Sequence, residues 1–315
     1  YLSFSPKETF EYINLKITII GCYSAMPKIG NNLSSQIIEI QNEIFLVDCG
    51  EGTQVGLRKN KIKFSRIKHI FISHLHGDHY FGLIGLISTF SLLNRSADLH
   101  VYGPLGIKEL IINQIKASGS WTKYKLIFHE LSSNNSQLIF QSDFIEVSTI
   151  PLSHRIYTNG FLFKEVNLPL TLNREAIDKN DVSIAYSNKL KQGFDVVNER
   201  GIVIKNNVLT LAGKVAKSYA YCSDTEYDES IVKLINNCDA LYHESTFLEK
   251  HVKLSKTTKH STAKQAGKIA KLSNTKLLIL GHYSSRYENI EMFKIEAKIE
   301  FENVVLAEDS KIIEI

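Results

Sequence analysis

The sequence has few cysteines, no long apolar run and no tract of low complexity. Its four cysteines form no C-x-x-C pair, and each lies in an apolar or strand-like stretch of the 315 residues. This usage indicates reduced, buried thiols in a cytoplasmic protein. No apolar run is long enough to span a membrane, and the N-terminal residues lack the layout of a signal peptide. We therefore expect a cytoplasmic protein with no membrane association.

The chain also has little net charge. Its 37 basic residues exceed its 33 acidic residues by only four, and the sequence pI is about 8.6. A mildly basic chain permits a polyanionic partner but does not require one. The hydrophobic content of 43% and the charged content of 22% are ordinary for a globular protein. A chain of this length can bury a large core in one domain or in two.

One histidine-rich run predicts a metal site. Ser73-His74-Leu75-His76-Gly77-Asp78-His79 places three imidazoles and a carboxylate within six positions. It follows a strand-like segment at 67–72 and precedes a helix-like segment at 81–93. Such a loop can direct alternate side chains at two neighbouring cations, and these ligands suit Zn²⁺, with Mn²⁺ or Fe²⁺ as alternatives. A polar turn that is merely rich in histidine is the competing interpretation.

Three further candidate ligands occur later in the chain. His154, Asp224 and His282 each lie just past an apolar, strand-like stretch. Polar residues in this position are typical of a site built on the ends of strands. A single histidine after a strand is more often structural than a ligand. The four groups together, in this order, are far more specific than any one of them.

Four other motifs accompany these ligands. They are Asp48-Cys49-Gly50-Glu51-Gly52-Thr53-Gln54, His243-Glu244-Ser245-Thr246-Phe247, His260-Ser261-Thr262 and Gly281-His282-Tyr283-Ser284-Ser285-Arg286-Tyr287. Together with the H-x-H-x-D-H run, they resemble the ribonuclease Z family of the metallo-β-lactamase superfamily. The resemblance extends from about Leu15 to the C-terminus and so covers nearly the whole chain.

The expected architecture combines the resemblance with the apolar pattern. Strand-like segments occur at 15–20, 35–40, 43–48, 67–73 and 99–102 in the first half, and at 217–222, 240–243 and 277–280 in the second, with helices between them. This pattern favours an α/β protein with two packed sheets flanked by helices. The resemblance implies the αββα sandwich of the metallo-β-lactamase fold, as a single domain over residues 1–315 with an inserted flexible arm at about 164–208.

The resemblance also implies a ligand set and a reaction. His74, His76 and His154 would hold one Zn²⁺; Asp78, His79 and His282 would hold a second; Asp224 would bridge both. The implied activity is a tRNA 3′ endonuclease that removes the 3′ trailer from precursor tRNA. A metal-held hydroxide would attack the phosphodiester after the discriminator nucleotide, leaving a 3′-hydroxyl on the tRNA and a 5′-phosphate on the trailer.

Four residues receive supporting or catalytic roles by the same resemblance. Asp78 would accept the proton of the nucleophile, and His260, oriented by Glu244, would protonate the leaving 3′-oxygen. Asp48 would orient a ligand histidine without binding the metal itself. The competing interpretations are a histidine at a helix start for His260 and a strand-end turn carboxylate for Asp48.

The insert at about 164–208 is polar and basic. A long solvated loop and a protruding arm that clamps RNA phosphates both fit this composition. The resemblance favours the arm, which would grip tRNA away from the chemistry, and a homodimer in which one subunit's arm presents the RNA to its partner's metal site. The candidate RNA contacts are Lys28, Arg174, Lys179, Lys189, Lys191, Ser285 and Arg286. The chain departs from the family at Ser183–Ser187, where a Gly-Pro-rich turn is absent, and at Pro27–Asn32, where an arginine is absent.

Two other functions fit parts of the sequence. One is another hydrolase of the superfamily, a phosphodiesterase or a thioesterase. The other is an RNA-binding protein without metal. The basic insert argues against a small substrate, which needs no remote grip, and the complete ligand set argues against a protein without metal.

Overall fold

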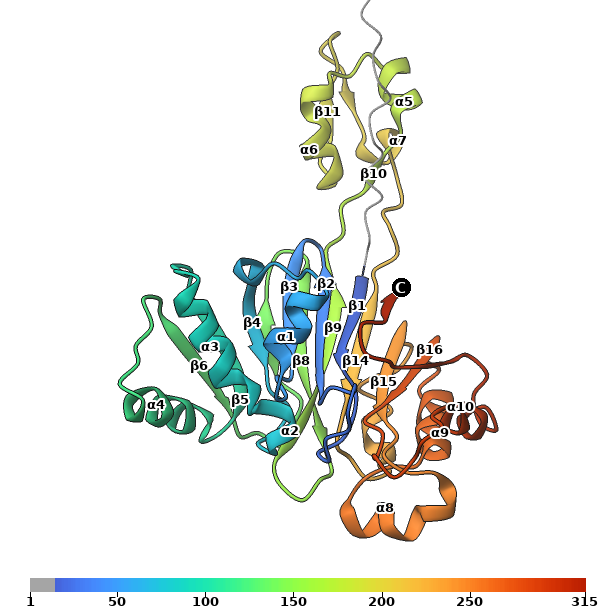
Figure 1. Ribbon diagram of the computed structural model, residues 1–315. Coiled ribbons are helices and arrows are strands. Elements are labelled where there is room, and N and C mark those ends of the chain that lie inside the picture. The colour runs from blue at the N-terminus through green and yellow to red at the C-terminus, as the bar shows by residue number, and fades with distance from the viewer. Residues whose placement is uncertain (1–14) are drawn as a thin grey trace, which may run out of the picture.

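The computed structural model describes residues 15–315, so residues 1–14, for which we had no functional expectation, lie outside the described part. Two seven-stranded sheets pack face to face, with helices on their outer sides (Figure 1). The fold is the predicted αββα arrangement. None of the helices within residues 15–315 combines the length and the apolar character that a membrane span requires.

The first sheet is formed mostly by the N-terminal half of the chain. In spatial order its strands are β18 (Ile312–Glu314), β1 (Leu15–Gly21), β2 (Ser35–Ile40), β3 (Glu43–Val47), β4 (Ile67–Phe71), β5 (Leu99–Pro104) and β6 (Leu126–Leu131). β1, β2 and β3 form the predicted antiparallel meander, whereas β3 to β6 are parallel. β18, the last strand, pairs antiparallel with β1 and forms one edge of this sheet.

The second sheet is formed by later segments. In spatial order its strands are β17 (Val304–Leu306), β16 (Leu277–Gly281), β15 (Ala240–Glu244), β14 (Ser218–Cys222), β9 (Thr158–Glu165), β8 (Ile145–Leu152) and β7 (Leu138–Gln141). The chain passes from β14 to β15 through a short 3₁₀ helix, η3 (Glu229–Ile231), where the sequence predicted a helix. Asn237, in the left-handed conformation at φ 59°, ends this connection just before β15.

Helices cover the outer faces of both sheets. On the first sheet these are α1 (Thr53–Lys59), α3 (Gly82–Leu92) and α4 (Ile107–Ala117), and η1 (Phe64–Arg66) precedes β4. On the second sheet these are α9 (Ala263–Leu272) and α10 (Glu291–Ala297), with η4 (Glu249–His251) and α8 (Val252–Thr258) at one end. Thr262 begins α9 with a capping box, in which its hydroxyl accepts from the Gln265 backbone N–H and the Gln265 side chain accepts from the Thr262 N–H.

Aromatic side chains fill the space between the two sheets. Phe45 and Phe71 of the first sheet meet Phe161 and Phe163 of the second at ring-centroid distances of 5.3 to 5.5 Å. These positions alternate along their strands, so one face of each strand supplies the core. Burial of large rings contributes much of the apolar stabilisation of such a sandwich, because each removes about 150–250 Å² from water.

Residues 166–217, here called the arm, lie outside the two sheets. Glu165 and Lys217 pair at its base, where the Glu165 N–H donates to the Lys217 carbonyl at 2.9 Å. Its elements are β10 (Thr171–Leu172), α5 (Arg174–Lys179), η2 (Ile184–Tyr186), α6 (Ser187–Lys191), β11 (Val196–Val197), β12 (Val203–Ile204), α7 (Asn206–Leu209) and β13 (Thr210–Leu211). A small core of its own, which includes Ile177, Leu190 and Leu209, holds them together. In Figure 1 the arm projects from the end of the sandwich opposite α2 (Gly77–Tyr80).

Candidate metal centre

The candidate ligands lie where several strands end at the same edge of the sandwich. β4 leads to His74, β8 leads to His154, β14 leads to Asp224 and β16 leads to His282. β8, β14 and β16 run in the same direction, so their carboxyl ends coincide. Asp78 and His79 lie on the first turn of α2, where the sequence had suggested an irregular loop.

Two groups of ligand atoms face each other across this edge. One contains His74, His76 and His154, and the other contains Asp78, His79 and His282. In the first, His76 Nδ1 lies 2.9 Å from His74 Nε2 and 3.3 Å from His154 Nε2. In the second, Asp78 Oδ2 lies 3.4 Å from both His79 Nε2 and His282 Nε2.

Asp224 lies between the two groups and directs one oxygen at each. Its Oδ2 lies 3.4 Å from His74 Nε2 and 3.7 Å from His154 Nε2. Its Oδ1 lies 3.1 Å from His282 Nε2 and 3.3 Å from His79 Nε2. A buried carboxylate in this position can contribute one oxygen to each of two cations.

In three of the ligand histidines, the ring nitrogen on the side away from the centre is held by a hydrogen bond. His79 Nδ1 lies 2.7 Å from Asp48 Oδ2, and His154 Nδ1 donates to the Lys259 carbonyl at 2.8 Å. His282 Nδ1 lies 2.9 Å from Thr246 Oγ1. These partners place the ring protons on Nδ1 and leave the Nε2 lone pairs directed into the centre.

This arrangement of lone pairs fits a cation. His79 Nε2 and His282 Nε2 are only 3.3 Å apart, and neither carries a proton to share when Nδ1 is the donor. Two lone pairs at this separation repel unless a proton or a metal cation lies between them. Imidazole nitrogens with carboxylate oxygens are the donor set of Zn²⁺, Mn²⁺ and Fe²⁺ sites. The residues present therefore fit a pair of divalent metal ions.

The electrostatics of the histidines agree with this fit. Burial lowers the pKa of His154 to about 4 and that of His76 to about 4, so both are neutral, which is the form that binds metal. Burial also opposes a charge on His79, but Asp224, Asp78 and Asp48 together raise the pKa of His79 well above its ordinary value. A divalent ion would replace that proton, and metal binding then releases it.

Two supporting carboxylates each hold one histidine directly and another through a hydroxyl group. Asp48 bonds His79, and it accepts from Ser73 Oγ at 2.9 Å, which in turn lies 3.0 Å from His74 Nδ1. Glu244 Oε2 accepts from Thr246 Oγ1 at 2.6 Å, and Thr246 contacts His282.

Glu244 also holds His260. Its Oε1 lies 2.7 Å from His260 Nδ1. The His260 side chain is 11% exposed and its ring lies 4.9 Å from that of His154, so it faces the ligand cluster while Thr262 is the residue that caps α9. Burial opposes a charge on His260, but the Glu244 carboxylate raises its pKa to about 9.

Sequence reasoning assigned no role to Ser73, Thr246 or Tyr221. The Tyr221 hydroxyl donates to Asp48 Oδ2 at 2.7 Å. Ser73 and Thr246 each lie inside a motif that the sequence analysis identified. Their place in these motifs was the one sequence feature that could have pointed to a role in the centre. Tyr221 is 173 residues from Asp48, and only the register between the sheets brings them together.

The predicted RNA contacts fall in two places. Lys28 lies on the loop after β1, which meets the His282 segment where the Ser24 N–H donates to the Tyr283 carbonyl at 3.2 Å. Ser285 and the exposed Arg286 follow His282, and the Arg286 guanidinium lies 5.2 Å from the centre of the Phe247 ring. The other four, Arg174, Lys179, Lys189 and Lys191, are exposed on α5 and α6 of the arm.

The cysteines remain outside the centre. All four are buried and free, as the sequence predicted. Cys49 and Cys222 are near the motifs, but neither belongs to a ligand group among residues 15–315. Burial raises the pKa of the Cys49 thiol to about 12, which opposes a thiolate there.

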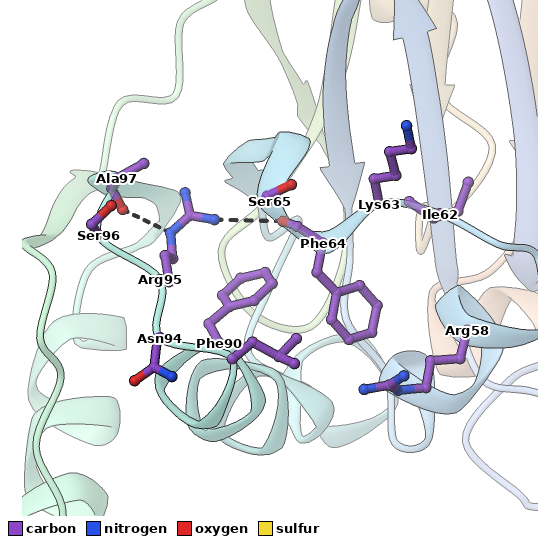
Figure 2. Close-up of a pocket in the computed structure, with 11 residues that line it drawn as sticks. Arg58, Ile62, Lys63, Phe64, Ser65, Phe90, Asn94, Arg95, Ser96 and Ala97 are labelled. Carbon is purple, nitrogen blue, oxygen red and sulfur yellow. Dashed lines mark hydrogen bonds between the residues drawn. The ribbon is translucent and has the colours of Figure 1, made fainter.

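A cavity of about 480 Å³ lies at the N-terminal ends of β4 and β5, beside η1 and the C-terminal end of α3 (Figure 2). Figure 2 shows Arg95 between Ala97 and Phe64, and its Nε donates to the Ala97 carbonyl at 2.8 Å. The guanidinium also lies 4.9 Å from the centre of the Phe90 ring. Arg95 therefore connects the segment that precedes β4 to the segment that precedes β5. None of the metal ligands lines this cavity.

Comparisons with known proteins identify a matching family model and close relatives in sequence. A family model described as "Anti-Pycsar protein Apyc1" matches residues 15–304. Ribonuclease Z of Bacteroides thetaiotaomicron is 43% identical over 300 residues, which cover 95% of each protein. Ribonuclease Z of Bacteroides fragilis is 42% identical over 295 residues, covering 94% of this chain and 97% of that protein.

Solved structures also resemble this chain. Human tRNase Z, short form, superposes with a TM-score of 0.69 at 27% identity, covering 95% of this chain and 99% of that one. The metallo-β-lactamase fold protein YhfI of Bacillus subtilis superposes with a TM-score of 0.67 at 18% identity, covering 95% and 98%, which supports the fold alone.

The sandwich and the histidine–aspartate centre at its edge define a hydrolase of the metallo-β-lactamase fold. By the family model and the curated relatives, the chain belongs to the sequence family described as anti-Pycsar protein Apyc1 and to the ribonuclease Z family.

Proposed function

We propose that this protein is the endoribonuclease that removes the 3′ trailer from precursor tRNA, cutting after the discriminator nucleotide. The observation that carries the proposal is the pair of ligand groups joined by Asp224, in a chain 42–43% identical to two ribonuclease Z proteins over nearly its full length. Tight two-metal sites of this kind suit the in-line displacement of a phosphodiester.

Two Zn²⁺ ions per chain are the proposed cofactors, with Mn²⁺ and Fe²⁺ as alternatives. His74, His76 and His154 would hold one ion; Asp78, His79 and His282 would hold the other; Asp224 would join them. When bound, such a pair acidifies water at neutral pH and neutralises charge on the phosphate.

The protein's own residues supply the proton transfers. Asp78 Oδ2 faces His79 and His282, and the neighbouring histidines hold its pKa well below the ordinary value even though burial opposes this. Asp78 is therefore ionised, the form in which a carboxylate binds metal, and by the resemblance to the family it is also the proposed acceptor of the nucleophile's proton. His260, charged beside Glu244, is the proposed donor to the leaving 3′-oxygen.

The arm is the proposed grip on the tRNA. Of its basic residues, Arg200 pairs with Asp181 and Lys205 pairs with Asp195. Arg174, Lys179, Lys189 and Lys191 have no ion-pair partner among residues 15–315. These four exposed cations are therefore available to phosphates, as the sequence expectation requires.

A homodimer in the cytoplasm completes the proposal. The arm projects away from its own metal centre (Figure 1), so RNA held by the arm is better placed for the centre of a second copy. Four free cysteines are consistent with a reducing compartment.

A second candidate is the phosphodiesterase for a small substrate that the sequence also left open. The discriminating experiment compares cleavage of a precursor tRNA with hydrolysis of bis(p-nitrophenyl) phosphate. We expect the parent protein to act on both, with cleavage of the RNA at a single position. Hydrolysis of the small ester without cleavage of RNA would favour the second candidate.

The role of the arm is tested by charge removal. Replacing Arg174, Lys179, Lys189 and Lys191 by alanine should weaken binding of precursor tRNA and lower the log–log salt slope by about one unit for each phosphate that is no longer neutralised. The matched control replaces the paired Arg200 and Lys205. Hydrolysis of the small ester should be unchanged in both variants. Equal RNA affinity in the two variants would contradict the arm's role.

Complementation tests the dimer. One variant lacks residues 171–211, replaced by a short Gly-Ser linker, because the β10–β13 pair brings the two ends together. The other carries Asp224→Ala. Each alone should fail on precursor tRNA, and a mixture that exchanges subunits should regain activity. Mixed dimers that form without activity would exclude presentation of RNA by one subunit to its partner.

A further inference from the structure

The hairpin between β8 and β9 forms a second cavity, directly beside the metal ligands. Its volume is about 370 Å³, within the lower range of small-ligand pockets. It is lined by residues 151–154 and 156–159 of the hairpin and by Asn134, from the connection between β6 and β7. His154 belongs both to this cavity, here called the hairpin pocket, and to the first ligand group.

The hairpin pocket contains polar groups without partners. The Asn159 side chain is buried, at 1% exposure, and its Nδ2 donates to the Tyr157 hydroxyl at 2.8 Å. Tyr157 donates in turn to the Ser133 carbonyl at 3.0 Å, which fixes the orientation of the amide. Asn159 Oδ1 then has no hydrogen-bond partner among the described residues. A buried acceptor of this kind is normally satisfied by a water molecule or by a ligand atom.

A second amide and a cation lie at the mouth of the pocket. Asn134 is exposed, and its side chain makes no hydrogen bond within residues 15–315. Arg155 is exposed on the hairpin between the lining segments and has no ion-pair partner in the described part of the chain. Arg155 directly follows the candidate ligand His154 in the chain, and the His154 ring lies 5.0 Å from that of His76 and 4.9 Å from that of His260. Arg155 is therefore one residue from the ligand cluster.

We propose that the hairpin pocket binds the nucleobase next to the bond that is cut, with Asn134 reading its edge and Arg155 contacting the adjoining phosphate. This inference rests on the proposed function and names a specificity subsite for it. An asparagine amide offers a donor and an acceptor side by side, the pattern that matches adenine. Single-stranded RNA is recognised through such base edges, with phosphate contacts that fix the register. Ile156 and Tyr157 supply apolar surface beside these groups.

The test uses Asn134→Ala, Arg155→Ala and Arg155→Lys. Precursor tRNAs with each of the four bases on either side of the cut are cleaved under single-turnover conditions. The parent should prefer one base at one of these positions by about tenfold or more, and Asn134→Ala should abolish that preference. Arg155→Ala should raise KM for all the RNAs, and Arg155→Lys should restore part of the affinity. Metal content and hydrolysis of bis(p-nitrophenyl) phosphate, which has no base, should stay at the parent level.

Inhibition by adenosine 5′-monophosphate provides an independent measurement. It should inhibit hydrolysis of the small ester by the parent, and less so in Asn134→Ala. A base preference that survives in Asn134→Ala, or an equal decrease of RNA and ester hydrolysis in Arg155→Ala, would overturn the subsite. Failure of the proposed function is distinct, because the parent would then hydrolyse the ester and cleave no precursor tRNA.

Discussion

Asp48→Asn tests whether the Asp48 carboxylate orients the candidate metal ligand His79. Asp48 is fully buried, and its Oδ1 accepts from the Ser73 backbone N–H at 2.8 Å. Its Oδ2 lies 2.7 Å from His79 Nδ1 and also accepts from Ser73 Oγ and the Tyr221 hydroxyl. Asp48 has φ 55°, and asparagine adopts this left-handed conformation as readily as aspartate does. The substitution therefore changes the hydrogen bonds and not the backbone.

An asparagine here must place its NH₂ group in one of two positions, and each is unfavourable. In place of Oδ1, the NH₂ group opposes the Ser73 N–H, and a buried N–H without an acceptor costs about 1–3 kcal/mol. In place of Oδ2, it opposes the Nδ1–H of His79. The ring relieves that contact by moving its proton to Nε2, the atom that faces Asp224 and His282. A proton on Nε2 excludes His79 as a metal ligand.

We expect Asp48→Asn to lower metal affinity or ester hydrolysis by about 10–100-fold, the usual effect of removing such a partner. Elemental analysis after dialysis and a metal titration measure the first, and bis(p-nitrophenyl) phosphate measures the second. Tyr221→Phe is the matched control, because it removes one donor to Asp48 and leaves the contact with His79. Parent-like metal content and rate in Asp48→Asn would refute the role assigned to this carboxylate.

The same contacts and one half-buried carboxyl group support three more predictions. Asp224→Ala should reduce the metal content to below one ion per chain, since each ligand group is deprived of an oxygen; two retained ions would contradict the bridge. His260→Ala should keep metal and RNA affinity but slow single-turnover cleavage by about 10²–10⁴-fold, with a smaller effect on the p-nitrophenyl ester, whose leaving group needs no proton. Burial raises the pKa of Asp309 to about 6. Its ionisation should therefore reduce stability as pH rises from about 4 to about 6, and Asp309→Asn should remove that decrease, about 1 kcal/mol after allowance for partial exposure, in urea unfolding at both pH values.

The structure brings the candidate ligands together, and the sequence could anticipate this because they lie in short local motifs at the ends of strands. The contacts among ligand atoms of the H-x-H-x-D-H run and of the residues after β8, β14 and β16 range from 2.9 to 3.7 Å. Local patterns say little about register between sheets, so Tyr221 behind Asp48 was not expected. The pairing of β18 with β1 was also not expected, because a three-residue strand is too short to show a periodic pattern.

Three residues of the metal centre adopt a strained backbone conformation. Asp48, Asp224 and His282 each follow a strand and each adopt a left-handed conformation, with φ of 55°, 59° and 60°. This conformation costs a non-glycine residue about 1–2 kcal/mol, and histidine lacks much of the local hydrogen bonding that helps aspartate. At His282 the backbone N–H donates to the Cys22 carbonyl at 2.7 Å, which ties the residue to the end of β1. The sharp turn brings each side chain back across the sheet edge toward the others, so the strain is the structural cost of assembling ligands from separate strands at one point.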